Sequence, residues 1–332
     1  MTPPRCTPTS LAARTTEREE DRGPTVSVDR PDPRLIASVA QGIRERVLEH
    51  SIKNNGGYMS QACSAAELLA TCYGGAVRLS PLEEASTPPP FERVPAPGAP
   101  LYTGAGVHGE KAPDLDRFII SPAHYALVVY AALIEVGRLA KDALDHFNAD
   151  GSTVEMIGAE HSPGFETTTG SLSQAISQAG GIALARRLKG ESGRTWVFMS
   201  DGEFQEGQTW EAFQALSFHG LDTVRVIVDV NLAQCDGPMD QVMVIEPLAE
   251  RLRAFGASVD CVDGHDVPAL IEAMDRPAEP GRPHVVLAYT DPVRGLPLLN
   301  ERRPVLHYLR FTGEDEKERY AQAYAEMVGR DV

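Results

Sequence analysis

Apolar residues follow two different periods along the chain. In its first half they recur every three or four residues, which is typical of helices packed on one face. After about residue 190, short runs rich in β-branched residues alternate with helical segments, as in strands joined by helices. The expected helices are 34–50, 64–74, 123–139, 172–188, 207–218, 247–255 and 267–274, and the expected strands are 195–200, 224–229, 258–262 and 284–289. This order predicts an α/β fold, a doubly wound parallel sheet with helices on both faces.

Three segments lie outside this pattern. Residues 1–30 are rich in Pro, Thr, Arg and Glu with little to bury, which predicts a disordered tail. Residues 81–113 hold eight prolines, a density that excludes a helix or a ladder strand and predicts a long surface loop. Residues 316–332 are expected to form a terminal helix or tail, which leaves 31–315 as one domain.

The expected helix 64–74 carries a start signal of its own. Ser64 is followed three residues later by Glu67, the spacing of a capping box, in which side chain and backbone satisfy each other's hydrogen bonds. We therefore expect Ser64 to be the N-cap of this helix.

Composition narrows the expected partners and location. Among 332 residues, 47 Asp and Glu stand against 31 Lys and Arg; the net charge of −16 disfavours nucleic acid and anionic membrane surfaces. The five cysteines include no CxxC pair and indicate neither a disulfide framework nor a zinc site, so a reduced, cytoplasmic setting is expected. The longest uncharged apolar run, 118–134, contains Pro122 and His124 and does not predict a membrane span.

An acid and an amide follow two of the expected strands. Ser200-Asp201-Gly202-Glu203 follows the first, and Asn231 follows the next, with 28 residues between Gly202 and Asn231. Ligands bind at the carboxyl ends of strands in open α/β sheets. Carboxylate, amide and backbone carbonyl oxygens suit a Mg²⁺ ion that keeps other positions for phosphate oxygens and water. The spacing therefore predicts a site for magnesium and a diphosphate.

This segment resembles the thiamine diphosphate motif, and most closely that of transketolase. The similarity extends to further blocks in the same order, which together cover roughly residues 35 to 315: 54–70, 116–133, 166–185, 200–231, 255–266 and 302–311. Transketolases have two further domains, the pyrimidine-binding and the C-terminal one. The chain therefore resembles the N-terminal, diphosphate-binding subunit of a split, two-component transketolase, whose C-terminal partner subunit would complete an α₂β₂ heterotetramer.

The resemblance implies roles for residues around the cofactor, thiamine diphosphate with Mg²⁺. Asp201, Asn231 and the backbone carbonyl of Ala233 would bind the metal. The remaining cofactor contacts would come from Gly170, Ser171, Leu172, Gly202, Glu203, His124 and His307. For Asp201 and Ser171, helix capping is the alternative reading. Ser200 and Ser173 stand where the family has glycine, and a serine is tolerated there unless the backbone needs a positive φ.

Four residues are candidates for catalysis by the same resemblance. His124 and His307 would lie near the reactive part of the cofactor, although a buried core histidine is the alternative for His124. His161 lies in a loop where transketolases bind substrate. Tyr58 stands where the family has a histidine that contacts the donor hydroxyl; a phenol with a pKa of about 10 donates a hydrogen bond but is a poor base at neutral pH.

Two further residues receive roles of a different kind. Glu206 matches a family acid at the subunit interface, with a favourable position at a helix N-terminus as the alternative. His265 matches a segment that we interpret as structural.

The resemblance leaves three functions open. The first is transfer of a two-carbon ketol unit from a ketose, or its phosphate, to an aldehyde, active only with the partner. The second is decarboxylation of a 2-oxo acid with acyl transfer in a specialised biosynthetic pathway, which Tyr58 keeps open. The third is a non-catalytic scaffold subunit, which the Asp201 and Asn231 pair disfavours because a scaffold needs no metal ligands.

Overall fold

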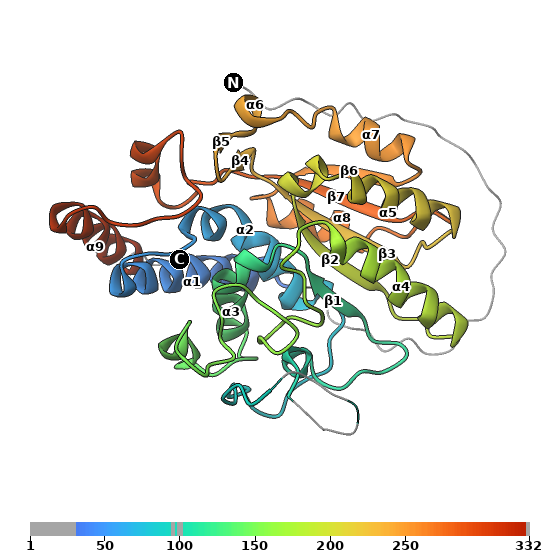
Figure 1. Ribbon diagram of the computed structural model, residues 1–332, viewed down its shortest axis with the longest axis horizontal. Helices are drawn as coiled ribbons and strands as arrows, with labels where there is room; N and C mark the ends of the chain where they lie inside the picture. The colour runs from blue at the N-terminus through green and yellow to red at the C-terminus, as the bar shows by residue number, and fades with distance from the viewer. Residues whose placement is uncertain (1–30, 94–96, 98–101, 330–332) are drawn as a thin grey trace.

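A five-stranded parallel sheet forms the centre of the computed structural model, which describes residues 31–93, 97 and 102–329 (Figure 1). The strands lie in the order β1-β2-β3-β7-β6, and every neighbouring pair is parallel. Their bounds are β1 Arg117–Ile120, β2 Thr195–Ser200, β3 Val224–Val230, β6 Ser258–Asp263 and β7 His284–Tyr289. A short antiparallel hairpin, β4 Ala233–Gln234 with β5 Gly237–Pro238, follows β3. The expected tail 1–30 lies outside the described residues.

Helices cover both faces of the sheet, which confirms the predicted fold class (Figure 1). The helices are α1 Pro33–Asn54, α2 Met59–Thr71, α3 Ala126–Glu135, α4 Gln174–Leu188, α5 Gly207–Phe218, α6 Met239–Val242, α7 Leu248–Ala254, α8 Val267–Asp275 and α9 Glu314–Val328. One core joins the sheet to α1, α2, α3, α8 and α9. A second core joins the opposite face to α4, α5 and α7.

The sequence pattern missed one strand and lengthened one helix. The apolar run from residue 118 contains both the edge strand β1 and the helix α3, separated only by a short turn that includes Pro122. Because both elements are buried on all sides, neither shows a polar face that would separate their periods. The expected helix 123–139 begins where a 3-10 turn, Ala123–Tyr125, leads into α3, but its end is wrong: α3 ends at Glu135, before Gly137 at φ 72°.

The expected capping box of the second helix is also wrong. Helix α2 begins at Met59, and all thirteen of its residues are buried between its neighbours and the sheet. Ser64 lies inside the helix and donates its hydroxyl to Asp229 in β3 at 2.6 Å. Glu67 instead forms a buried ion pair with Arg44 of α1 and accepts from His265. The side chains of Ser64 and Glu67 therefore bond residues of other elements and do not cap the start of the helix.

The Pro-rich segment folds as a loop against the body of the domain. Its described residues form no α-helix and only isolated bridges, Ser86 with Leu139 and Pro90 with Ser152. A 3-10 turn over Gly104–His108 ends the segment. His108 is buried and bonds Glu166 at 3.1 Å, so this end of the loop is tied to the core.

The last helix belongs to the same packed body. Helix α9 lies beside α1 (Figure 1), and Tyr320 and Met327 on it are buried in the larger core. The boundary expected at residue 315 falls inside this helix. Within the described residues, no helix is both long enough and apolar enough to cross a membrane.

His50 on α1 offers a test of this packing by pH. Its ring lies edge-on to Phe147 at 4.7 Å, and burial is the main cause that lowers its pKa from 6.5 to about 4. Between these values the unfolded chain binds a proton that the folded chain does not. The stability therefore falls as the pH drops through this window, by about 1.4 kcal/mol per pH unit.

Replacing His50 by Gln removes this proton uptake. We expect the difference in unfolding free energy between wild type and His50→Gln to shrink by about 2 kcal/mol from about pH 6.5 to about pH 5, in urea denaturation. A difference that stays constant between the two pH values would show that the imidazole is not buried as the structure has it.

Candidate active site

The carboxyl ends of β2 and β3 lie side by side and border a cleft of about 320 Å³. Ser200 pairs in register with Asp229, so the polar residues that follow meet at one edge of the sheet. The carboxylate of Asp201 accepts a hydrogen bond of 2.7 Å from the backbone N–H of Leu232, directly after Asn231. The structure thus brings together the acid and the amide that the sequence places at two strand ends.

Asp201 is a buried carboxyl group that forms no ion pair with any residue that the structure describes. Its residue is 2% exposed, and burial, followed by the nearby charge of Asp229, raises its pKa to about 8 although three backbone N–H groups lower it. No lysine or arginine lines the cleft in the described part of the chain. A bound divalent cation would favour the ionised form of this carboxyl group and supply the missing positive charge.

Asp229, which the sequence analysis missed, organises the floor of the cleft. Its fully buried carboxylate accepts hydrogen bonds from Ser64 at 2.6 Å, Tyr125 at 2.9 Å, Thr290 at 2.5 Å and the amide of Asn231 at 3.0 Å. These donors come from four separate segments of the chain. The signal was present in the sequence, since Asp229 is an acid near the end of a strand run that is apolar apart from Arg225.

The same bonds orient Asn231. Because a carboxylate only accepts, the atom that faces Asp229 must be the amide nitrogen, and the opposite atom is the oxygen. That Oδ1 accepts from the backbone N–H of Ala233 at 2.9 Å and has a second lone pair. Both Asn231 and Ala233 line the cleft with Asp201, so the three predicted magnesium ligands border one space.

Glu203 connects the end of β2 to the residues that follow β1 and to the start of α4 through hydrogen bonds. Its carboxylate is fully buried and accepts from the backbone N–H of Ser200 at 2.8 Å and of Ser173 at 2.9 Å, as well as from the hydroxyl groups of Ser200 and Ser121. Burial raises the pKa of this carboxyl group. The predicted contact of Glu203 with a diphosphate would involve its backbone, because the side chain is committed to these bonds.

The segment before α4 forms another wall of the cleft. Leu172 lines it, whereas Gly170 and Ser171 lie just beside it on the same exposed turn. The expected start of the helix at residue 172 is two residues early, because Ser173 adopts a left-handed φ of 71° and acts as the N-cap. Ser200, by contrast, has an extended φ of −98°, so this departure from glycine costs no backbone strain.

Three rings lie together at another side of the cleft: His124 and His307 line it, and Tyr58 packs against both of them. Tyr58 lies 5.7 Å from His124 and 5.6 Å from His307 between ring centroids, and the two histidines are 5.1 Å apart. Paired backbone bonds between Gly57 and Leu309 bring these segments together. A Cβ at Gly57 would lie 2.2 Å from the hydroxyl oxygen of Ser51, so a larger residue there would require Ser51 to move.

These side chains are neutral around pH 7. Burial lowers the pKa of His124 to about 3 and also lowers that of His307. Burial raises the pKa of Tyr58, so its phenol keeps its proton and acts as a hydrogen-bond donor.

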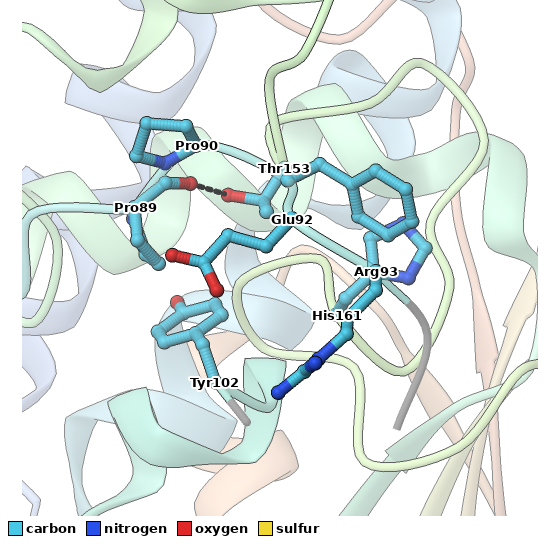
Figure 2. Close-up of a pocket in the computed structure, with 8 residues that line it drawn as sticks. Pro89, Pro90, Glu92, Arg93, Tyr102, Thr153 and His161 are labelled. Atoms are coloured by element: carbon cyan, nitrogen blue, oxygen red, sulfur yellow. Dashed lines mark hydrogen bonds between the residues drawn. The ribbon is translucent and has the colours of Figure 1, made fainter. Parts of the chain in front are cut away.

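The structure does not bring His161 together with the other three residues predicted to be catalytic. It lines a separate pocket of about 210 Å³ (Figure 2). Its Nε2 lies 2.8 Å from a carboxylate oxygen of Glu155, and its ring packs against Phe91 of the Pro-rich segment at 4.7 Å. Figure 2 shows Glu92, Arg93 and Tyr102 around the same space, so the Pro-rich segment 81–113 supplies most of the residues that line this pocket.

Comparison with known proteins identifies the family to which this site belongs. Residues 106–303 match the family model of the transketolase thiamine diphosphate binding domain. The chain belongs to the transketolase family. It is 35% identical over 274 residues to an uncharacterized transketolase family protein of Sinorhizobium fredii, covering 82% of this chain and 88% of that relative. The match confirms the resemblance expected from the sequence.

Two other relatives of the transketolase family carry more specific names. A 6-deoxy-6-sulfo-D-fructose transketolase subunit of a Clostridium species is 28% identical over 277 residues, with 83% of this chain and 91% of the relative covered. An apulose-4-phosphate transketolase subunit of Actinobacillus succinogenes is 31% identical over 197 residues, with 59% and 71% covered.

Solved structures confirm the transketolase fold. The Campylobacter jejuni transketolase superposes with a TM-score of 0.64 at 18% identity, over 89% of this chain and 46% of that one. The Leishmania mexicana transketolase gives 0.61 at 21% identity, with 45% of its chain covered. The chain thus spans a little under half the length of the solved transketolases that it matches.

The oxygen donors that border the cleft have the chemistry that a Mg²⁺ ion would need. The described residues contain no cluster of three or more His, Cys, Asp or Glu side chains that could hold a metal, so a magnesium site here depends on amide and carbonyl oxygens. Asn231 and Ala233 supply these next to the single carboxylate of Asp201. Mg²⁺ is commonly held by one or two carboxylates together with phosphate oxygens and water.

Glu206 and Val242 line the cleft, and Val242 begins an exposed apolar segment. Glu206 is exposed at the N-terminus of α5, where the helix dipole favours an acid. Val242, Met243 and Val244, at the end of α6 and just after it, are 42%, 49% and 53% exposed. His265 lies away from the cleft, and its bonds to Glu67 and to the backbone of Asp291 fit the predicted structural role.

Removing the carboxylate of Glu203 should loosen the strand ends. Each of its two oxygens faces a backbone N–H, so the amide of Glu203→Gln must point an NH₂ group at a donor. We expect Glu203→Gln to lower the free energy of unfolding by about 2–3 kcal/mol, and Ser121→Ala, which removes one donor, by about 1 kcal/mol. Glu206→Gln, three residues away and exposed, should change it by less than about 0.5 kcal/mol in the same urea titration. Equal effects of the two Glu→Gln changes would contradict the role of Glu203.

Proposed function

We propose that this chain is the diphosphate-binding subunit of a two-component transketolase, which transfers a two-carbon ketol unit from a ketose or its phosphate to an aldehyde. The observation that carries this proposal is the set of Asp201, Asn231 and Ala233 around one cleft, with a buried Asp201 carboxylate that no cation lining the cleft balances in the described part of the chain. These oxygens would hold Mg²⁺, and the metal would hold the diphosphate of thiamine diphosphate.

A partner subunit is part of the proposal. The named relatives of comparable length are themselves transketolase subunits, and the solved transketolases are about twice as long. The partner would supply the pyrimidine-binding domain and cover the side of the cleft next to Glu206 and residues 242–244. An α₂β₂ assembly in the cytoplasm, with the cofactor between subunits, follows from the family resemblance.

Within this assembly the residues of the chain would bind and orient. The cofactor, when bound, supplies stabilisation of the carbanion that cleavage of the ketose leaves. Asp201 and Asn231 would fix its diphosphate through the metal, and Leu172 would contact it from the wall of the cleft. His124, His307 and Tyr58 would present neutral side chains to the substrate, and closure by the partner would exclude water.

Tyr58 favours a second candidate function, 2-oxo acid decarboxylation with acyl transfer. Its phenol donates a hydrogen bond but does not accept a proton readily at neutral pH, so it differs from the family histidine that contacts a donor hydroxyl. A 2-oxo acid loses its carboxylate group and carries no such donor hydroxyl beside the bond that is broken. Substrate profiles therefore separate the two reactions.

Calorimetry of cofactor binding tests the proposal. Thiamine diphosphate with Mg²⁺ is titrated into the chain alone and into its mixture with the separately made C-terminal transketolase-like subunit. We expect tight binding only in the mixture, and its loss in Asp201→Ala because the only carboxylate of the metal set is removed. Asp236→Asn, an acid that lines the cleft outside the metal set, should bind as wild type does. No binding in a mixture shown to form a complex would refute a catalytic role and support a scaffold.

Tyr58→Phe tests the contact with substrate in the assembled enzyme. Loss of one hydrogen bond should lower kcat/KM for the preferred substrate about tenfold, equivalent to about 1.4 kcal/mol. Tyr308→Phe is the matched control, since this ring lies 5.0 Å from Tyr58 but, among the described residues, makes no ring contact with His124 or His307. Both variants are assayed with ketoses and with 2-oxo acids. Full activity of Tyr58→Phe would exclude a hydrogen bond from Tyr58 to the substrate.

A further inference from the structure

Gln61 is a buried amide with a defined partner at each end. It lies near the start of α2, is 3% exposed, and borders the cleft beside His307. Its Nε2 lies 3.2 Å from the backbone carbonyl oxygen of His307 and 3.1 Å from the Nδ1 of the same residue. Its Oε1 accepts the hydroxyl of Ser60 at 2.9 Å.

These contacts determine which way the amide points. The carbonyl oxygen of His307 can only accept, so the Gln61 atom that faces it must be the NH₂ group. The hydroxyl of Ser60 satisfies the oxygen at the other end. An inverted amide would place two acceptors against each other, so the network admits one orientation.

The amide in turn determines where His307 carries its proton. The NH₂ group of Gln61 lies within hydrogen-bond distance of both the backbone carbonyl oxygen and Nδ1, and an amide nitrogen can only donate, so Nδ1 must accept. A neutral imidazole has one acceptor and one donor nitrogen, which leaves the proton on Nε2. Burial lowers the pKa of His307, in agreement with a neutral ring.

The nitrogen that carries the proton is available to a ligand. Among the described residues, none forms a hydrogen bond with Nε2 of His307, and this atom is not one of the buried polar atoms left without a partner. The residue lines the cleft with His124 and Ser60.

We propose that Gln61 is a positioning residue that fixes the Nε2–H tautomer of His307, so that His307 offers a neutral hydrogen-bond donor to a hydroxyl, carbonyl or phosphate oxygen of the bound ligand. In this state Nε2 has no free lone pair and cannot take a proton, so His307 serves as a donor rather than as a general base. The tautomer stands on the geometry alone; the contact with a ligand oxygen rests on the proposed function.

Nitrogen-15 NMR of the full chain labelled in histidine measures the tautomer directly. At pH 7 we expect a pyrrole-type signal for Nε2 of His307 and a pyridine-type signal for Nδ1, assigned by their loss in His307→Gln. His265 is the internal reference with the opposite pattern, because the backbone N–H of Asp291 occupies its Nε2 at 2.8 Å and Glu67 accepts from its Nδ1. A proton on Nδ1 of His307 in the wild-type chain would overturn the proposal.

Two variants of Gln61 separate positioning from support of the fold. In Gln61→Glu the side chain becomes an acceptor, which should draw the proton to Nδ1 and reverse the two signals. Gln61→Met keeps the volume without a donor and should give an average of the two tautomers. His265 should be unchanged in both, which shows that the fold is intact. Unchanged His307 signals in either variant would contradict the role of Gln61.

Activity of the assembled enzyme tests whether His307 contacts the substrate. If the donor contacts substrate, Gln61→Glu should lower kcat/KM about tenfold or more, and the pH profile should gain an acidic limb that wild type lacks. A reversed tautomer with unchanged kcat/KM and pH profile would refute the ligand contact. Because the NMR arm needs neither cofactor nor partner, its result is independent of whether the proposed function holds.

Discussion

The cleft depends on two buried carboxylates that no lysine or arginine of the described residues neutralises. Asp229 and Glu203 lie at or just after the ends of central strands; Asp229 accepts from three hydroxyl groups and the amide of Asn231, and Glu203 accepts from hydroxyl and backbone N–H groups. A buried charge that lost these donors would be costly, so each donor is fixed in position by the carboxylate it faces. The geometry of Asp201, Asn231 and the start of α4 depends on this arrangement, since all three adjoin one of the two acids.

The sequence was most informative where strand and helix periods alternate. From residue 195 to 289 the expected strands and helices agree with the structure to within two residues, because the buried strands are short β-branched runs separated by polar turns and by helices with one buried face. It was least informative in the first half, where β1, α2 and α3 are buried all round and lack a polar face. Ser64 and Glu67 show the same limit, since their local spacing predicts a cap and their tertiary partners decide otherwise.

The site divides in a similar way. Asp201 and Asn231 follow strands, and the rule that strand ends meet at one edge of a sheet was sufficient to bring them together. Tyr58 and His307 are separated by most of the chain, and only the family resemblance linked them. Asp229 and Gln61 act through hydrogen bonds to other residues, and no spacing in the sequence indicates such partners. His161 was assigned from a loop whose path depends on the Pro-rich segment, so its position required the structure.

The left-handed backbone at Ser173 constrains how this chain can change over evolutionary time. A serine at φ 71° is disfavoured relative to glycine, and here Glu203 accepts its N–H while its hydroxyl bonds the backbone of Glu203 in return. These two hydrogen bonds help to stabilise the left-handed backbone of Ser173 and satisfy the buried Glu203. A lineage that loses the acid at 203 would have to regain glycine at 173, so substitutions at these positions are expected to occur as a pair.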